Sequence, residues 1–279
     1  MKEGTASRTA RGVAAHRQQY TRLAAPYGDP GADDALTRDV ADGLTRSPDS
    51  PRHAYLRART AFFDRVTTAA IDAGIGQVVI GAAGYDGRAF RYARPGVRWF
   101  EVDHPATQAD KLERLARLGL DTGHIRFIAA DFTADPITEP LLAAGLDATA
   151  PALFTLEGIA VYLDLDTLTR VLRAFRAIAA QGSLLAISFS NGRATSQERQ
   201  RFHDQLASIG EPARTTLLPD AAQTLLASVG WTAVDPRPAD PRPPGDHQPG
   251  DHQQSDDQQS DDRSRPAGLM LARAGGPRG

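Results

Sequence analysis

Short apolar runs alternate with longer amphipathic stretches through the middle of the chain. The apolar runs lie at residues 78–81, 98–102, 125–129, 152–156 and 184–189. Between them, apolar residues recur at helical spacing over 106–118, 136–144 and 166–180, with Asp166 as the expected N-cap of the last helix. Strands that alternate with helices in this way predict an α/β fold in which a parallel sheet carries helices on both faces.

Further elements are predicted on both sides of this alternating region. Helical spacing at 5–23 and 53–73 indicates an N-terminal helical cap, and the segment YGDPGADD is expected to break the first helix at Gly28, Pro30 and Gly31. On the other side, we expect helices at 196–209 and 219–229 and strands at 231–234 and 268–273. The predicted organisation is a cap or lid (1–74), a core (75–234), an insertion (235–266) and a last strand with a tail (267–279).

The insertion differs in composition from the rest of the chain. Residues 235–266 contain no Leu, Ile, Val, Phe, Tyr or Trp, and they carry near-repeats of DHQ and SDDQQ. Such a segment cannot bury enough apolar surface to offset the entropy lost on ordering, so we predict that it is disordered. His247 and His252 lie among aspartates, but a solvated loop is a better interpretation than a weak metal site.

Composition narrows the classes of function. The chain has 279 residues with 32 basic and 34 acidic side chains, and the scattered charges argue against a nucleic-acid binder. The absence of cysteine excludes disulfides, a thiolate zinc site and a cysteine nucleophile. No apolar run approaches the roughly 18 residues of a membrane span, and the N-terminal segment lacks the apolar core of a secretory signal. We therefore predict a cytoplasmic protein that binds neither membrane nor a resident metal.

Glycines and acidic residues follow the apolar runs. The carboxyl ends of these runs lie at one edge of the predicted parallel sheet. The residues at these ends are Gly81, Gly84 and Gly87 after the first run, Asp103 at the second, Asp131 and Phe132 after the third, and Glu157 after the fourth. In an open parallel sheet, ligands bind across the carboxyl ends of the strands. Asp103 can accept from two ribose hydroxyls, and Asp131 can accept from an exocyclic amine while Phe132 packs on a base. The pattern therefore predicts a ligand that contains a nucleoside.

Each of these residues also has a simpler interpretation. The glycines could form only a tight turn, and their spacing departs from G-x-G-x-x-G, which argues against a dinucleotide. Asp103 could cap the helix that follows Pro105, and Glu101 is a competing acid because it shares the strand face of Asp103. Asp131 could be an ordinary surface aspartate in a turn.

Four ordered segments carry a resemblance to a known family. QVVIGAAGYDGRAFR, WFEVDHP, AADF and PALFTLEGIAVYL resemble the leucine carboxyl methyltransferase family of S-adenosylmethionine-dependent enzymes, particularly its bacterial branch that acts on small molecules. The resemblance extends from Ser7 to Ile187. It implies a Rossmann-like class I methyltransferase fold, with a mostly parallel seven-stranded sheet, helices on both faces and an N-terminal helical cap. It also implies S-adenosylmethionine as the cofactor.

The resemblance also implies roles for individual residues. Arg59 would pair with the methionine carboxylate of the cofactor, Gly81 and Gly84 would lie in its glycine loop, and Asp103 would hold the ribose. Asp131 and Phe132 would contact the adenine, and Glu157 would lie near the amino group. Tyr162 resembles a family tyrosine that lines the acceptor side, and it is predicted to be catalytic together with Arg88, which is a candidate from its charge and not from the resemblance. Two departures stand out: Ala82 replaces the first family glycine, and Thr133 stands where members that methylate a protein C-terminus carry arginine.

A small carboxylic acid is the favoured acceptor, giving a methyl ester, with a secondary-metabolite intermediate as one such acid. A carboxylate is already ionised at neutral pH and needs no general base, so catalysis would consist of alignment and desolvation. Arg8, Arg17, Arg88 and Tyr162 are the candidates that could hold it.

Three other functions remain open. A hydroxyl or phenol acceptor would need a base, for which His16 and His104 are available. An NAD-dependent oxidoreductase and a cofactor-binding protein without activity are the less favoured alternatives. The sequence makes no prediction of oligomeric state.

Overall fold

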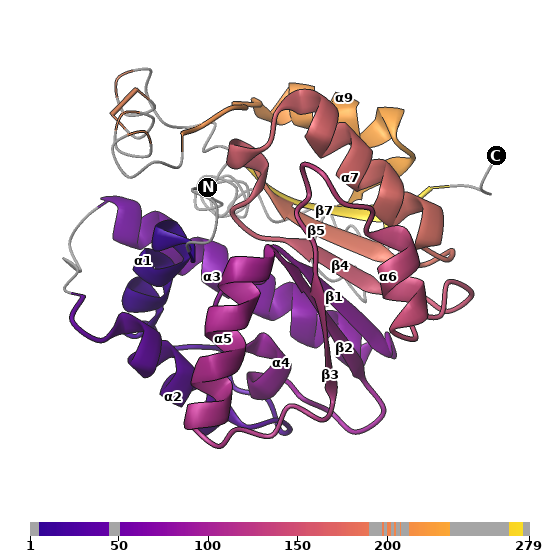
Figure 1. Ribbon diagram of the computed structural model, residues 1–279. Coiled ribbons are helices and arrows are strands. Elements are labelled where there is room, and N and C mark those ends of the chain that lie inside the picture. Colours follow the sequence, from indigo (N-terminus) through magenta and orange to yellow (C-terminus); the bar gives the residue numbers. More distant parts are fainter. Residues whose placement is uncertain are drawn as a thin grey trace, which may run out of the picture.

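The computed structural model describes residues 6–44, 51–189, 212–234 and 268–275, together with isolated positions between 197 and 207. These residues form one sheet covered by helices on both faces (Figure 1). The helices are α1 (Arg8–Arg17), α2 (Pro30–Ala41), α3 (Pro51–Asp72), α4 (Arg88–Arg91), α5 (Pro105–Arg117), α6 (Thr138–Ala143), α7 (Leu165–Ile178), α9 (Pro219–Ser228) and the short 3-10 turn η1 (Ala160–Tyr162). The strands are β1 (Gln77–Gly81), β2 (Arg98–Asp103), β3 (Ile125–Ala129), β4 (Leu153–Leu156), β5 (Leu184–Ser188), β6 (Trp231–Val234) and β7 (Leu269–Ala274).

The sheet has seven strands in the order β3-β2-β1-β4-β5-β7-β6. Strands β1 to β5 are parallel, and β7 runs antiparallel between β5 and β6. The prediction of a mostly parallel seven-stranded sheet is therefore confirmed. Chain order reverses between β1 and β4, and ligands in open sheets bind at such a reversal. The register places Gly81 beside both Val102 of β2 and Leu156 of β4, so the predicted strand-end residues lie at one rim.

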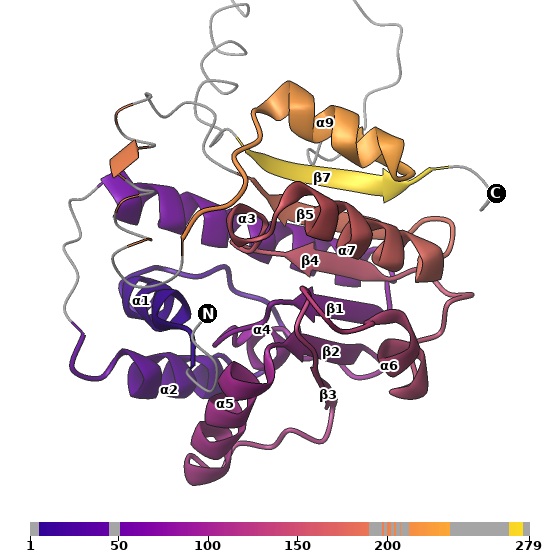
Figure 2. The ribbon, with the colours of Figure 1, turned by 45° about the horizontal axis from the view of Figure 1, so that its top comes forward.

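Apolar clusters on the two faces of the sheet form the core. On one face, α6, α7 and α9 pack around Phe154, whose ring stacks on Phe175 at 5.0 Å between centroids. On the other, α1 to α5 enclose a second cluster that includes Phe63 of α3 and Trp99 of β2. Figure 2 shows α3 lying on the side of the sheet opposite α7 and α9. Burial on both faces explains why the parallel strands are almost continuously apolar in sequence.

The segment expected to break the first helix lies beyond the end of α1 at Arg17, and it also starts a second helix, which was not predicted. Helix α2 begins at Pro30, and the Asp29 side chain accepts a hydrogen bond from the backbone N–H of Ala32 at 3.1 Å. Proline suits the first position of a helix because its missing N–H would have no helical partner there. Gly28 is required just before, since a Cβ at this position would lie 2.2 Å from the carbonyl oxygen of Arg91.

Other boundaries differ from the sequence prediction by smaller amounts. The N-cap of α7 is Asp164 rather than Asp166, because Asp164 Oδ1 accepts from the N–H of Thr167 at 2.7 Å. The short helix α4 was not anticipated. The predicted strands at 231–234 and 268–273 are confirmed as β6 and β7. The predicted helix at 196–209 falls largely, and the disordered insertion at 235–266 entirely, outside the described residues.

Within the described residues, no helix combines the length and hydrophobicity that crossing a membrane would require. The same residues contain no group of three or more His, Asp or Glu side chains arranged to hold a metal ion.

Candidate active site

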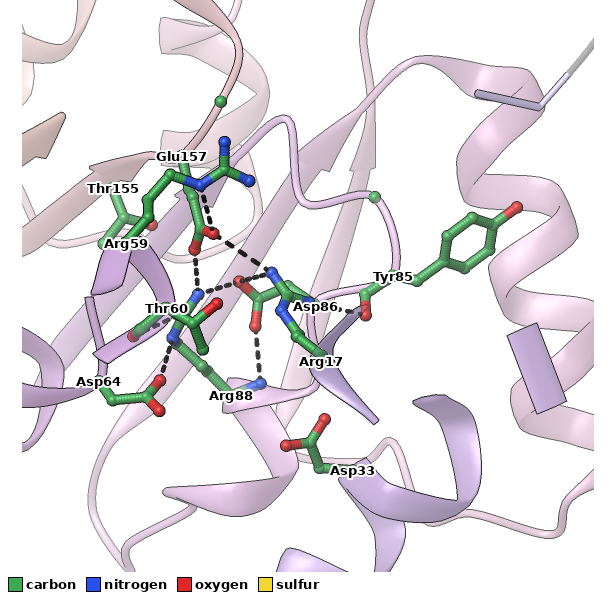
Figure 3. A network of polar contacts seen from close by, with 12 residues as sticks. Arg17, Asp33, Arg59, Thr60, Asp64, Tyr85, Asp86, Arg88, Thr155 and Glu157 are labelled. Carbon is green, nitrogen blue, oxygen red and sulfur yellow. Dashed lines mark hydrogen bonds and ion pairs between the residues drawn. The ribbon is translucent and has the colours of Figure 1, made fainter. Parts of the chain in front are cut away.

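Glu157 lies at the centre of a buried polar network at the end of β4 (Figure 3). Its Oε1 lies 3.0 Å from Arg59 Nε and 3.6 Å from Arg17 Nη2, and its Oε2 accepts from Arg88 Nη1 at 2.6 Å. Burial alone would raise the pKa of Glu157, but Arg88, Arg59 and Arg17 outweigh it and hold the pKa well below its usual range. Glu157 is therefore a fixed negative charge at the sheet rim.

Arg88 is enclosed by carboxylates rather than turned toward an open space. Its Nε donates to Asp64 Oδ1 at 2.7 Å, and its Nη1 donates to Asp86 Oδ2 at 2.5 Å as well as to Glu157. Its Nη2 donates to the carbonyl of Thr60 at 3.2 Å. Because every nitrogen of the guanidinium has an internal partner, the geometry favours a positioning role for Arg88 over the direct acceptor contact expected from sequence.

Arg59 binds Glu157 through one nitrogen and directs its two terminal nitrogens away from that carboxylate. Only its Nε donates to Glu157, and Figure 3 shows the two terminal nitrogens pointing away from that carboxylate. They lie against Gly158, where an added Cβ would come within 2.9 Å of Nη1. Burial alone would lower the pKa of Arg59, but Glu157, Tyr55 and Tyr162 raise it. This guanidinium is thus a permanent cation beside a position with no room for a side chain.

Asp103 holds the glycine loop between β1 and α4. Its Oδ2 accepts a short hydrogen bond from the N–H of Gly84, and its Oδ1 accepts from the N–H of His104 at 2.6 Å. Burial raises the pKa of Asp103, although both N–H groups oppose that shift. The alternative N-cap role does not apply, because His104 caps α5 by accepting from the N–H of Ala106 through Nδ1.

The two predicted cofactor-loop glycines have different structural requirements. Gly84 has φ +50°, in the left-handed region that favours glycine. Gly81 ends β1, and an added Cβ would lie 2.8 Å from Leu156 Cδ2 and 3.3 Å from the Phe132 ring. Gly81 is therefore needed for close packing on the face of the sheet that α6, α7 and α9 cover, whereas Gly84 is needed for the path of the loop.

Ala82→Gly is expected to raise the free energy of unfolding by roughly 0.5–1 kcal/mol. Ala82 has φ +54°, where a Cβ is strained, and it is the one residue other than glycine with positive φ in the described part of the chain. Glycine relieves the strain but makes the unfolded chain more flexible, so the net gain is modest. Urea unfolding measures this change in the free energy of unfolding. The matched control is Ala83→Gly at the next, buried position, which should lower stability, and equal losses in both variants would contradict the prediction.

Asp131 and Phe132 follow β3 and lie close to the same rim. Asp131 Oδ1 accepts from the N–H and the hydroxyl of Thr133, both at 2.8 Å, while Oδ2 lies 3.9 Å from His104 Nε2. Oδ2 is thus the oxygen that faces away from the turn. The Phe132 ring is buried edge-on against Phe175, at 6.4 Å between centroids. Phe132 therefore packs in the core beneath the glycine loop.

The network extends to residues that the strand-end pattern did not identify. Arg22 pairs with Asp64 through Nε at 2.6 Å and Nη2 at 2.8 Å, and with Asp33 at 3.1 Å. Asp33 also pairs with Arg91, while Asp86 lies 3.8 Å from Arg17. The Asp86-Gly-Arg88 spacing in the glycine loop was a local sequence signal for one ion pair of the network. The contacts of Asp33 and Asp64 had no such signal, because their partners lie on distant segments.

The remaining candidates occupy separate places in the structure. Arg8 is exposed in the first turn of α1, and Tyr162 is half-buried at the end of η1. His16 of α1 and His53 of α3 are buried with their Nδ1 atoms 3.1 Å apart, and the Tyr20 ring meets His53 edge-on at 4.9 Å. Burial raises the pKa of Tyr20 to about 12. Helix α1, the residues just after it and helix α3 therefore bring together a cluster of titratable side chains.

Comparison with known proteins places these features in a family context. The model of the family described as leucine carboxyl methyltransferase matches residues 14–176. A protein of Parafrankia sp. (strain EAN1pec) is 42% identical over 146 residues, covering 51% of this chain and 46% of that protein. One of Mycobacterium tuberculosis (strain ATCC 25177 / H37Ra) is 36% identical over 189 residues, covering 63% and 59%. One of Mycolicibacterium paratuberculosis is 33% identical over 254 residues, covering 80% and 78%.

All three relatives carry the name "Putative S-adenosyl-L-methionine-dependent methyltransferase". The chain spans about half the length of the first two. Two crystal structures share its fold: a protein of Thermobifida fusca YX (TM-score 0.60, 19% identity, 99% of this chain and 97% of that one) and a DUF574 family protein of Streptomyces avermitilis (TM-score 0.59, 20% identity, 96% and 97%).

Proposed function

Because the chain belongs to the leucine carboxyl methyltransferase family, we propose that it transfers the methyl group of S-adenosylmethionine to a carboxylate of a small molecule. The observation that carries this proposal is the placement of Arg59 and Glu157 at the end of β4, with Asp103 at the end of β2. One strand, β1, separates these two groups in the sheet. A cofactor lying across β1 would meet an amino-acid site at one end and a ribose site at the other.

The residues at the rim fit the chemistry of this cofactor. The terminal nitrogens of Arg59, lying over Gly158, suit the cofactor carboxylate, and Glu157 suits the ammonium group. Asp103 suits the two ribose hydroxyls, and Asp131 Oδ2 suits the amine of the adenine. Gly84 lets the backbone approach the ligand closely. When bound, the cofactor supplies an electrophilic methyl group on a sulfonium.

The charges of the polar network balance, and one guanidinium directs nitrogens away from it. Five guanidinium groups meet four buried carboxylates: Arg17, Arg22, Arg59, Arg88 and Arg91 against Asp33, Asp64, Asp86 and Glu157. A fifth acid, Asp34, pairs with Arg91 from an exposed position. Asp34 balances the fifth guanidinium, so the network as a whole is neutral, and the support for an anionic ligand group comes from the terminal nitrogens of Arg59, which point away from Glu157.

The chemistry assigned to the protein consists of alignment and exclusion of water. An acceptor carboxylate is ionised at neutral pH, so no side chain would have to remove a proton for it to accept the methyl group. Alignment of the reacting groups can supply roughly 7–11 kcal/mol in favourable systems. Helices α1 and α3 supply Arg17 and Arg59 to the site, and we propose that the segment 1–74 forms the cap that contacts the acceptor.

Calorimetric titration and a methyl-transfer screen test this proposal. We expect S-adenosylhomocysteine, the demethylated cofactor, to bind with a micromolar or lower Kd and NAD not to bind. A screen of carboxylic acids with labelled S-adenosylmethionine should then yield a labelled product that mild alkali hydrolyses, as it does an ester. Tight NAD binding without S-adenosylhomocysteine binding would refute the methyltransferase proposal in favour of an oxidoreductase.

A hydroxyl or phenol acceptor is the second candidate, and the pair His16 and His53 favours it. A hydroxyl must lose its proton during transfer, so a base is needed. The paired imidazoles and Tyr20 lie on the cap, where an acceptor would contact the protein. A labelled product that resists alkali would be an ether and would select this alternative. Thr133, in place of the arginine of members that act on a protein C-terminus, supports a small molecule in either case.

A further inference from the structure

Lys111 is an unusual cation for this chain. Only Lys2 and Lys111 are lysines among 32 basic residues, and Lys111 is 1% exposed. Its Nζ donates to the backbone carbonyl of Asp86 at 2.7 Å and to Glu101 Oε2 at 2.5 Å. An ammonium is a compact charge with three donors, whereas a guanidinium is a wide planar fork. The compact ammonium of Lys111 on α5 thus joins Glu101 of β2 to the backbone of the glycine loop.

Lys111 contacts the glycine loop at the backbone of Asp86, whereas the carboxylate network contacts the Asp86 side chain. Asp86 accepts from Lys111 through its backbone oxygen, while its side chain accepts from the Arg88 N–H at 2.9 Å and from Arg88 Nη1 at 2.5 Å. Arg88 in turn donates to Glu157. Two residues earlier, Gly84 donates to Asp103. Asp103 thus holds the loop at Gly84 and Lys111 holds it at Asp86, beside the bonds from the N–H of Ala83 to the Val102 carbonyl and from Arg17 to the Tyr85 carbonyl.

We propose that Lys111, together with its counter-charge Glu101, is a positioning residue that fixes the glycine loop for cofactor binding. The inference rests on the proposed function, because it assigns the loop to the cofactor. Lys111 acts through the carbonyl of Asp86. Loss of this contact would let Asp86 move, and with it the Arg88 guanidinium that orients Glu157.

Protonation of Glu101 makes the support of the glycine loop by Lys111 sensitive to pH. Its Oε1 is buried and has no hydrogen-bond partner among the described residues, while Oε2 pairs with Lys111. Burial raises the pKa of Glu101 to about 7, with Lys111 opposing the shift and Asp86 and Asp103 adding to it. Below this pH Glu101 takes up a proton, so Lys111 loses its counter-charge. Affinity for the cofactor should therefore fall as the pH drops below about 7.

Calorimetric titration with S-adenosylhomocysteine between pH 6 and pH 8.5 tests the inference. Lys111→Met removes the donor, and Arg117→Met is the matched control, since Arg117 is a cation on α5 with a largely exposed side chain. Lys111→Met should weaken binding about tenfold or more at pH 8, as loss of a hydrogen bond from a charged group does. Arg117→Met should change binding less than about twofold.

The double variant Glu101→Leu/Lys111→Met separates positioning from folding. Removing both buried charges avoids leaving one unpaired, so the double variant should fold even where Lys111→Met does not. It still lacks the donor to Asp86, so we expect weak binding that no longer changes between pH 6 and pH 8.5 through Glu101. Wild-type affinity and pH dependence in this variant would overturn the inference. Absence of binding by the wild-type protein would instead overturn the proposed function and the inference with it.

Discussion

Asp64→Ala is expected to lower the free energy of unfolding by about 3–5 kcal/mol. Asp64 is fully buried and accepts from Arg22 through both oxygens and from Arg88 Nε at 2.7 Å. Alanine would leave two buried guanidinium groups without their shared carboxylate, and an uncompensated buried charge is the costly outcome. In a chain of this size, the melting temperature should fall by roughly 10 °C.

The pKa of Asp64 indicates the pH range in which this stabilisation acts. Burial would raise the pKa, but Arg88 and Arg22 lower it below its usual value. A carboxylate with a lowered pKa stabilises the folded state above its unfolded pKa near ~3.9 and loses that contribution as the pH falls further. The difference between wild type and Asp64→Ala should therefore be large at pH 7 and shrink in acid.

Asp72→Ala is the matched control on the same helix. Asp72 pairs with Arg94 at 3.2 Å, but both side chains are largely exposed. Exposed pairs contribute little, so its loss should cost less than about 1 kcal/mol. Equal effects of the two substitutions in urea unfolding would contradict the view that burial makes Asp64 important.

The residues at the strand ends could be predicted because the carboxyl ends of parallel strands lie at the same edge of the sheet. Apolar runs give the strands, and the residues after them must meet at one rim, as Asp103 and Glu157 do at the ends of β2 and β4. The last two strands were also located, since β6 and β7 each carry enough apolar residues to stand out. The α2 helix was missed because Pro30 and Gly31 break helices inside them but are tolerated at their start.

The buried network could not be predicted from the sequence. Arg88 lies 24 residues from Asp64 and 69 from Glu157, and no periodicity relates these positions. The sequence therefore left Arg88 as a candidate for the acceptor, and only the three-dimensional arrangement shows its carboxylate partners. Glu101 and Asp103 share a strand face, and the fold separates them: Asp103 meets the glycine loop, whereas Glu101 pairs with Lys111 below it.

The network connects the N-terminal helices to the rim of the sheet. Arg17 and Arg59 reach Glu157 from α1 and α3, and Arg22 reaches Asp64 from the segment between α1 and α2. Movement of these helices would therefore change the position of Glu157. On the proposed function, these contacts would couple acceptor binding at the cap to cofactor alignment at Glu157.

Asp103→Ala is expected to weaken binding of S-adenosylhomocysteine by about 10²-fold or more, because two charge-assisted hydrogen bonds to the ribose would be lost. Asp103→Asn keeps one acceptor oxygen and should give an intermediate Kd. Calorimetric titration measures both variants, with Asp121→Ala as the control, since Asp121 is exposed just before β3.

The stability of the Asp103 variants distinguishes a ligand-binding acid from a structural one. Burial raises the pKa of Asp103, so at neutral pH its ionised form costs the folded state free energy, the reverse of Asp64. In Asp103→Asn, removal of the buried charge is opposed by the amide NH2, which cannot accept from the N–H of Gly84 or of His104, so we expect a small change in melting temperature together with weaker ligand binding. A protein keeps a charge that its own fold disfavours where a ligand compensates for it. Unchanged affinity in Asp103→Ala would mean that the ribose is held elsewhere.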